Sequence, residues 1–187
     1  MKRMISLGLG LMLLPLSALA SGEKLRAVKL PEPYTQECSG CHIAYQPGLL
    51  PDKAWQNIMQ GLAEHYGTDS TLEPEMVQLL RTWLLANAAT GEGKGRRFTE
   101  LPPEDRISKA YWYERKHRKI DAAVWRLESV KSRANCEVCH ERAEEGVYSE
   151  KDLTIPNGLS ELQKRPFLKA KGKYGKEHRK ERFRYGF

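Results

Sequence analysis

The stretches QECSGCHIAY, residues 36–45, and ANCEVCHERAEE, residues 134–145, decide how this chain is built. Each contains two cysteines that are separated by two residues and followed directly by a histidine. The two pairs use all 4 cysteines of the chain, and histidine is rare, with 5 in 187 residues. Because chance would not place two histidines in this way, the motifs predict one chemistry that is performed twice.

That chemistry is covalent haem attachment. Two thiols at this spacing form thioethers with the haem vinyl groups, and the adjacent imidazole binds the iron. A disulfide framework has no need of the histidines, a thioredoxin-like redox pair needs a βαβ context, and zinc needs its cysteine pairs closer together than residues 38 and 136. We therefore predict two covalently bound haem c groups. The predicted attachment residues are Cys38 and Cys41 for haem 1 and Cys136 and Cys139 for haem 2, with His42 and His140 as the first axial ligands.

The second axial ligand of each iron separates an electron carrier from an enzyme, because an open position binds small molecules. Outside residues 1–20 only Met59 and Met76 are methionines, and both lie in the first half. Haem 2 therefore cannot take a methionine from its own half. Met59 is a rival ligand for haem 1, although core packing is the interpretation that we favour for it.

Three other histidines remain. His65 ends the apolar stripe of a helix predicted from Asp52 to about Gly67, and we favour it as a ligand over a core or surface histidine. His117 lies 23 residues before His140, as His65 lies 23 residues after His42, and we favour ligation there over a solvated role in a basic cluster. Crossed ligation, with His65 and His117 exchanged, stays open. We interpret His178 as a solvated tail residue.

The chain as a whole is predicted to be mainly α, with little β structure. We expect two small cytochrome c-like haem-binding modules, residues 21–90 and 105–163, joined by a linker at residues 91–104 that is rich in glycine, proline and charge. Pro74 suits the first turn of a helix in the first module, and a short helix is predicted after His140 as far as Gly146. The haem groups are expected to supply much of the core.

Residues 1–20, MKRMISLGLGLMLLPLSALA, read as a signal peptide with a basic start, an apolar stretch and small residues before Ser21. Pro15 and Ser17 interrupt the apolar stretch, so cleavage is favoured over a retained membrane anchor. We predict export to the periplasm.

The end of the chain has its own composition. Residues 164–187 contain ten Lys and Arg against two Glu, whereas the net charge of the whole chain is +7. Such a basic tail is expected to be flexible and either simply solvated or in contact with an anionic membrane surface or an acidic redox partner. Nucleic acid is not expected as a partner in the periplasm.

Three longer stretches make the chain resemble a known family, the bacterial periplasmic dihaem cytochromes c. They are CSGCH with WQNIMQGLAEHYG, then RISKAYWYERKH, and KSRANCEVCHERAEEGVYSEKDLTIP, within about residues 30–157. The resemblance implies His65 and His117 as the distal ligands of haems 1 and 2. It also implies an electron-transfer protein, whose partners would be another cytochrome c, such as the oxygen-binding sphaeroides haem protein, or a membrane cytochrome b.

The sequence thus predicts a periplasmic carrier with two low-spin bis-histidine haems, and no enzyme. The alternative is an enzyme or ligand-binding cytochrome in which one haem is five-coordinate and binds peroxide, nitrite, NO or O2. A dihaem peroxidase would be about twice this length, and no acid-base constellation is evident among the glutamates.

Overall fold

The computed structural model describes residues 25–90 and 98–172, and it is helical within them. The α-helices are α1 (Glu32–Cys38), α2 (Asp52–Gln60), α3 (Pro74–Asn87) and α4 (Tyr111–His117), and residues 161–172 are also helical. Short 3-10 helices lie between them: η1 (Pro47–Leu49), η2 (Leu62–Glu64), η4 (Pro103–Asp105), η5 (Ile107–Lys109), η6 (Val124–Arg126), η7 (Cys136–Val138) and η8 (Glu150–Asp152). The described residues contain isolated β-bridges and no strand, which confirms the mainly α prediction.

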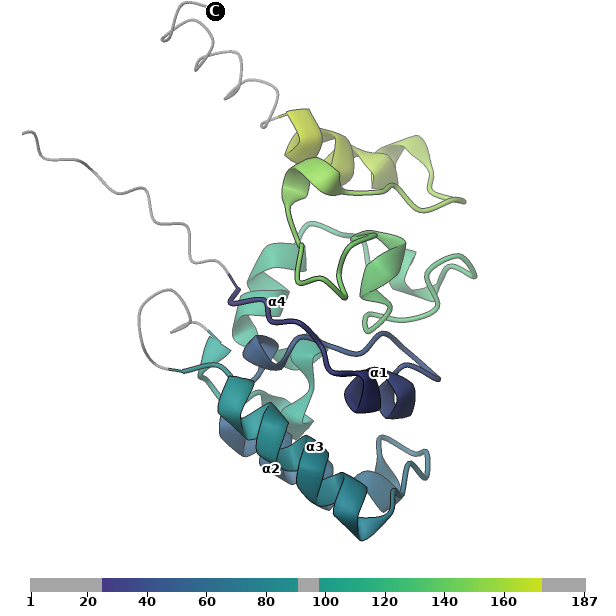
Figure 1. The fold of residues 1–187 in the computed structure, drawn as a ribbon. Helices are drawn as coiled ribbons and strands as arrows, with labels where there is room; N and C mark the ends of the chain where they lie inside the picture. The colour runs from purple at the N-terminus through teal and green to yellow at the C-terminus, as the bar shows by residue number, and fades with distance from the viewer. Residues whose placement is uncertain (1–24, 91–97, 173–187) are drawn as a thin grey trace, which may run out of the picture.

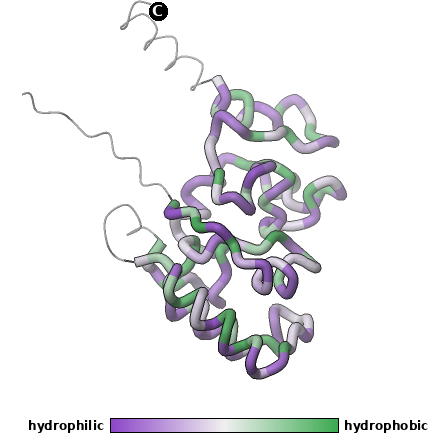
Figure 2. Tube along the Cα trace, viewed as in Figure 1, coloured by the Kyte–Doolittle hydropathy of each residue, from purple (hydrophilic) through white to green (hydrophobic). Residues whose placement is uncertain are grey.

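The chain starts near the middle of the molecule with α1, runs to one end with α2 and α3, and then returns past α4 to the opposite end (Figure 1). Helices α2 and α3 pack side by side at one end, and the helix at residues 161–172 lies at the opposite end. Between them lie α4 and the turns that carry the second cysteine pair. Hydrophobic residues are interspersed with hydrophilic ones along the trace (Figure 2).

The first hydrophobic cluster joins α1, α2 and α3. Proline at the first position of α3 fixes the helical backbone dihedral where no amide hydrogen is needed, as predicted for Pro74. Leu80 and Leu84 of α3 are each 1% exposed and face the buried Trp55 and Met59 of α2. Met59 therefore packs in the core, as the sequence predicts.

A second, smaller cluster belongs to the other half of the chain. It consists of Val124, Val130, Leu159 and Phe167, with Trp125 and Cys139 packed against it. Phe167 lies in the helix at residues 161–172 and is 3% exposed. The first residues of the predicted basic tail, 164–172, are thus helical and anchored to this cluster.

Gln46 joins the two halves. This side chain is 1% exposed, and its amide nitrogen donates to the carbonyls of Val28 and Glu144 at 3.1 and 2.7 Å, while its oxygen accepts from the Val28 amide at 2.8 Å. Gly146 lies at the same junction with φ +76°, and a Cβ there would meet Ala27 at 2.6 Å. Only glycine fits this backbone and this close approach.

Two predicted helices differ in the structure. Helix α2 ends at Gln60 because the Gly61 amide donates to the carbonyls of both Asn57 and Ile58 and the chain then leaves the helical conformation. His65 therefore follows the 3-10 helix η2 and is not on α2. After His140 the chain forms turns instead of the predicted helix, since amides bond three residues back, as in Ala143 to His140, until Gly146.

None of the helices within residues 25–90 and 98–172 combines the length and the apolar character that crossing a bilayer requires. The predicted signal peptide, residues 91–97 of the predicted linker, and His178 lie outside the described residues. The proposed module boundaries stay a prediction.

Replacing Gln46 by Leu should lower the free energy of unfolding by about 2–4 kcal/mol, because buried carbonyl and amide groups lose their partners at about 1–3 kcal/mol each. Denaturant titration measures this loss. Gln36→Leu, at an exposed position of α1, is the matched control and should change stability by no more than about 0.5 kcal/mol. Equal stability of the Gln46 variant and the wild type would contradict the role of Gln46.

Candidate haem sites

His42 follows the first cysteine pair directly. Cys38 is the last residue of α1, and the intervening turn leaves Cys41 exposed. The His42 Nδ1 lies 2.7 Å from the carbonyl oxygen of Ile43, which can only accept, so Nδ1 carries the proton and donates. The Nε2 atom is thereby left as the basic nitrogen, the form in which histidine binds a metal.

His65 approaches His42 from the loop after η2. The Ser70 amide donates to the Leu62 carbonyl at 2.8 Å, and the Thr68 amide donates to the backbone carbonyl of His65 at 3.1 Å, which folds this loop back. The centroids of the His42 and His65 rings are 6.2 Å apart, and the ring planes are inclined by 37°. The structure thus brings together the two predicted ligands of haem 1.

His117 and His140 form a second pair. His117 is the last residue of α4, and its Nδ1 donates to the Tyr113 carbonyl one turn earlier, at 2.9 Å. His140 follows the turn of η7, where its amide donates to the Cys136 carbonyl at 2.8 Å. The ring centroids of His117 and His140 are 6.3 Å apart, with planes at 89°.

Both spacings fit one metal ion between each pair of rings. With metal to nitrogen bonds of about 2.0 Å and each nitrogen about 1.1 Å from its ring centre, two opposed imidazoles have centroids about 6.2 Å apart. Metal-bound histidines commonly donate their other ring nitrogen to a backbone carbonyl, as His42 and His117 do. The residues present therefore fit a haem iron at each pair.

Burial keeps three of these imidazoles neutral. It lowers the pKa of His140 to about 4, with a smaller contribution from the neighbouring His117. The pKa values of His65 and His117 are also lowered, in both cases chiefly by burial. A neutral imidazole is the metal-binding form, so little proton release would accompany ligation at neutral pH.

None of the four cysteines is paired in a disulfide. Burial raises the pKa of Cys136 to about 12 and that of Cys38 and Cys139 to about 11. Buried neutral thiols exchange slowly with disulfides, which suits residues destined for thioether bonds. Within the described part of the chain, no group of three or more His, Cys, Asp or Glu could hold a metal ion.

Each of the four histidines contacts a tyrosine ring, a feature that the sequence analysis did not anticipate. Two contacts are nearly parallel stacks, at 4.7 Å for His42 and 4.0 Å for His117, and two are inclined, at 4.8 Å for His65 and 5.4 Å for His140. The partners are Tyr45, Tyr113, Tyr66 and Tyr148, respectively. A tyrosine one to eight residues from each predicted ligand was the available signal.

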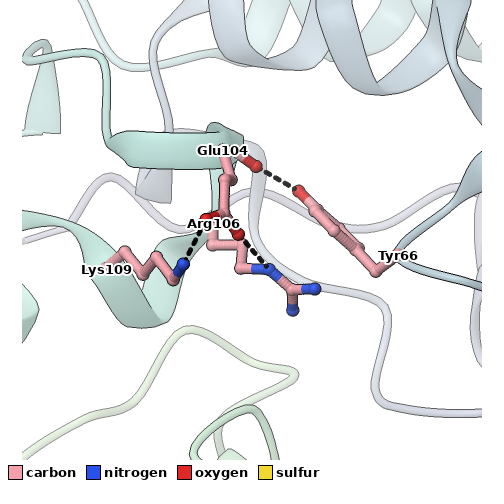
Figure 3. Close-up of polar contacts among 4 residues, drawn as sticks. All are labelled: Tyr66, Glu104, Arg106 and Lys109. Carbon is pink, nitrogen blue, oxygen red and sulfur yellow. Dashed lines mark hydrogen bonds and ion pairs between the residues drawn. The ribbon is translucent and has the colours of Figure 1, made fainter.

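Glu104, the last residue of the predicted linker, and Arg106, at the start of the predicted second module, contact Tyr66, the residue after His65 (Figure 3). The Arg106 guanidinium lies 3.9 Å from the centroid of the Tyr66 ring, and the Tyr66 hydroxyl donates to the Glu104 carbonyl at 3.1 Å. The Glu104 carboxylate in turn pairs with Arg106 at 3.2 Å and with Lys109. These four residues, the linker clamp, tie residues 104–109 to the residue after His65.

Several buried polar atoms around the second pair lack a hydrogen-bond partner among the described residues. They are the Nδ1 of His140, the hydroxyl of Tyr148 and the Nε of Arg133. Buried polar atoms in proteins are rarely left without a partner. The position of these atoms beside His140 and His117 fits a site that holds a large group with polar substituents, such as haem with its propionates.

The chain is similar in sequence and fold to solved dihaem cytochromes c. Two solved structures of the dihaem cytochrome c from Rhodobacter sphaeroides have 34% and 35% identity to this chain and TM-scores of 0.53 and 0.57. In both cases the match covers 65% of this chain and 99% of the solved chain. The protein from Shewanella baltica has 28% identity and a TM-score of 0.59, over 71% of this chain and 99% of that chain. A search of curated proteins gave no match.

The model of the family described as dihaem cytochrome c matches residues 34–148. This range contains both cysteine pairs and all four paired histidines. The family carries two haem c groups, which confirms the cofactor predicted from the motifs. With both attachment motifs, both imidazole pairs and the family match over more than half of its length, the chain belongs to the dihaem cytochrome c family.

Proposed function

We propose that this protein is a periplasmic electron carrier with two low-spin haems, each bound by two histidines from its own half of the chain. The observation that carries the proposal is the pair of centroid spacings, 6.2 Å for His42 and His65 and 6.3 Å for His117 and His140. Both spacings support the binding of one iron between the two imidazoles of each pair. Members of the dihaem cytochrome c family are generally electron carriers, and cytochromes c are typically exported.

A haem iron supplies a one-electron couple, and an iron with two imidazole ligands has no open position for a substrate. The protein's part is to hold the rings in place. His42 and His117 are oriented by backbone carbonyls, and each is stacked on a tyrosine. Such support reduces reorganisation when the charge at the site changes, which favours electron transfer over ligand exchange.

Partner binding is proposed for the basic tail. Residues 164–172 belong to the helix whose Phe167 packs in the second hydrophobic cluster. Residues 173–187 contain six Lys and Arg residues and two Glu residues. This charge suits an acidic redox protein, either another cytochrome c or a membrane cytochrome b, or an anionic membrane surface.

The oxidised protein should show two low-spin signals by electron paramagnetic resonance, and the reduced protein should not bind carbon monoxide at neutral pH. Both results follow if histidines fill both axial positions of each iron. A high-spin signal together with a carbon monoxide shift in the optical spectrum would instead reveal an open iron and favour a ligand-binding or enzymatic role.

Exchanging His65 for methionine should raise the midpoint potential of haem 1 and leave that of haem 2 nearly unchanged. Methionine ligation raises haem potentials, within the range of roughly 0.8 V that axial ligands span. A spectroscopic redox titration measures both potentials. His178→Met is the control and should shift neither potential, and a shift confined to haem 2 in the His65 variant would indicate crossed ligation.

Deleting residues 173–187 should weaken binding to anionic lipid vesicles at low salt and leave the haem spectrum unchanged. The deletion removes a net charge of +4 while keeping Phe167 in the second cluster. Each basic residue near an anionic surface contributes about 1 kcal/mol to binding. Unchanged vesicle binding by the truncated protein would rule out membrane contact through these residues.

A further inference from the structure

The His65 imidazole is held differently from the other proposed second ligand, His117. The His117 Nδ1 donates to the carbonyl of Tyr113 in the same helix, α4, and the two rings stack. His65 instead lies in the loop after η2, and within residues 25–90 and 98–172 neither of its ring nitrogens makes a hydrogen bond. Its orientation therefore depends on the ring contacts that it makes.

Tyr66 supplies one of these ring contacts. The centroids of the His65 and Tyr66 rings are 4.8 Å apart, and the ring planes are inclined by 56°. The Tyr66 backbone has φ +53°, in the left-handed region that residues with a side chain rarely adopt. Such a conformation persists where the surrounding contacts hold it, so the position of Tyr66 depends on residues outside the loop.

Arg106 and the two residues before it provide this hold. The Arg106 guanidinium lies 3.9 Å from the centroid of the Tyr66 ring, and its Nε donates to the Glu104 carboxylate at 3.2 Å (Figure 3). The Glu104 carbonyl accepts from the Tyr66 hydroxyl at 3.1 Å. The Asp105 carboxylate accepts from the Asn57 side-chain amide at 3.1 and 3.2 Å, which ties the same segment to α2.

We propose that Arg106 is the positioning residue for the second axial ligand of haem 1, because it holds the Tyr66 ring against His65. Its role is to slow the departure of His65 from the iron, so that haem 1 stays closed to small molecules. Haem 2 needs no such residue, since α4 itself fixes His117. The inference rests on the proposed function, because it takes His65 as a ligand of haem 1.

Lys109 offers a matched control. Its ammonium pairs with the same Glu104 carboxylate as Arg106 does, and the two cationic side chains are 43% and 35% exposed. The Lys109 side chain points to that carboxylate and away from the Tyr66 ring (Figure 3). Exchange of either cation for glutamine removes one positive charge beside Glu104, but only Arg106→Gln removes the cation from the face of Tyr66.

The test measures how fast cyanide replaces an axial histidine in the oxidised holoprotein. The iron to nitrogen bond breaks, an iron to carbon bond forms, and the iron stays ferric. At saturating cyanide the rate equals that of histidine dissociation. Freeze-quench electron paramagnetic resonance identifies the haem that reacts, because the ring-plane angles of 37° and 89° should give the two haems distinct signals.

Arg106→Gln should speed the exchange at haem 1 about three- to tenfold, as expected for the loss of one cation–π contact at a partly exposed site. The exchange rate at haem 2 should stay at the wild-type value, which also shows that the variant is folded. Lys109→Gln should leave both rates unchanged. Arg106→Lys keeps a cation for the Tyr66 ring, so its rate at haem 1 should fall between those of the wild type and Arg106→Gln.

A double variant tests whether Arg106 acts through Tyr66. Tyr66→Leu removes the ring that contacts both Arg106 and His65, so it should speed exchange at haem 1 at least as much as Arg106→Gln does. Addition of Arg106→Gln to Tyr66→Leu should then change the rate little, because the two residues belong to one path.

Three results would overturn the role of Arg106. They are wild-type exchange at haem 1 in Arg106→Gln, equal acceleration in Lys109→Gln, and full additivity of the Arg106 and Tyr66 changes. Acceleration at both haems would indicate general loosening and would also overturn it. Failure of the proposed function would appear earlier and separately, as a high-spin signal in the unmodified protein.

Discussion

The spacing between the paired imidazole rings constrains the rest of this structure. In the proposed bis-histidine ligation two rings would lie about 6.2 Å apart across an iron, and the histidines of each pair lie 23 residues apart in the chain. The chain satisfies this by ending elements at the ligands: η2 ends before His65, and α4 ends at His117. The short helices and many turns are a consequence, because long helices could not return to the motif so soon.

Around this constraint the protein builds a shell of aromatic and backbone contacts. The tyrosines at the histidines lie at the junction of apolar core and polar haem surroundings, where an aromatic ring with one hydroxyl is suited to both. The two hydrophobic clusters are separate, and Gln46 and Tyr45 connect the halves mainly by hydrogen bonds. The junction is therefore directional, which fixes one orientation of the halves more sharply than apolar packing alone would.

The sequence was most informative where chemistry dictates spacing. The cysteine pairs predicted two haem c groups and named His42 and His140. The search for second ligands among the remaining histidines named His65 and His117, and the structure pairs each of them with one of the first two. Pro74 predicted the start of α3 because its constraint is local. The helix predicted through His65 was wrong beyond Gln60, and the one predicted after His140 was wrong, because hydrogen bonds at Gly61 and Gly146 and the need to face a partner ring override apolar periodicity. Tyr45, Gln46 and the linker clamp depend on contacts between distant residues, which no local pattern reports.

The anchoring of Phe167 gives the basic tail a fixed point of attachment. Because residues 161–172 are helical and held by the second cluster, positive charge beyond Gly172 starts from one place on the molecule. Each later residue extends the reach by at most about 3.5 Å, so Arg184 acts within about 40 Å of that point. Under the proposed binding by the tail, a partner held in this volume would meet the protein at a raised local concentration and near the second haem site. The proposal then implies that haem 2 would exchange electrons with that partner first.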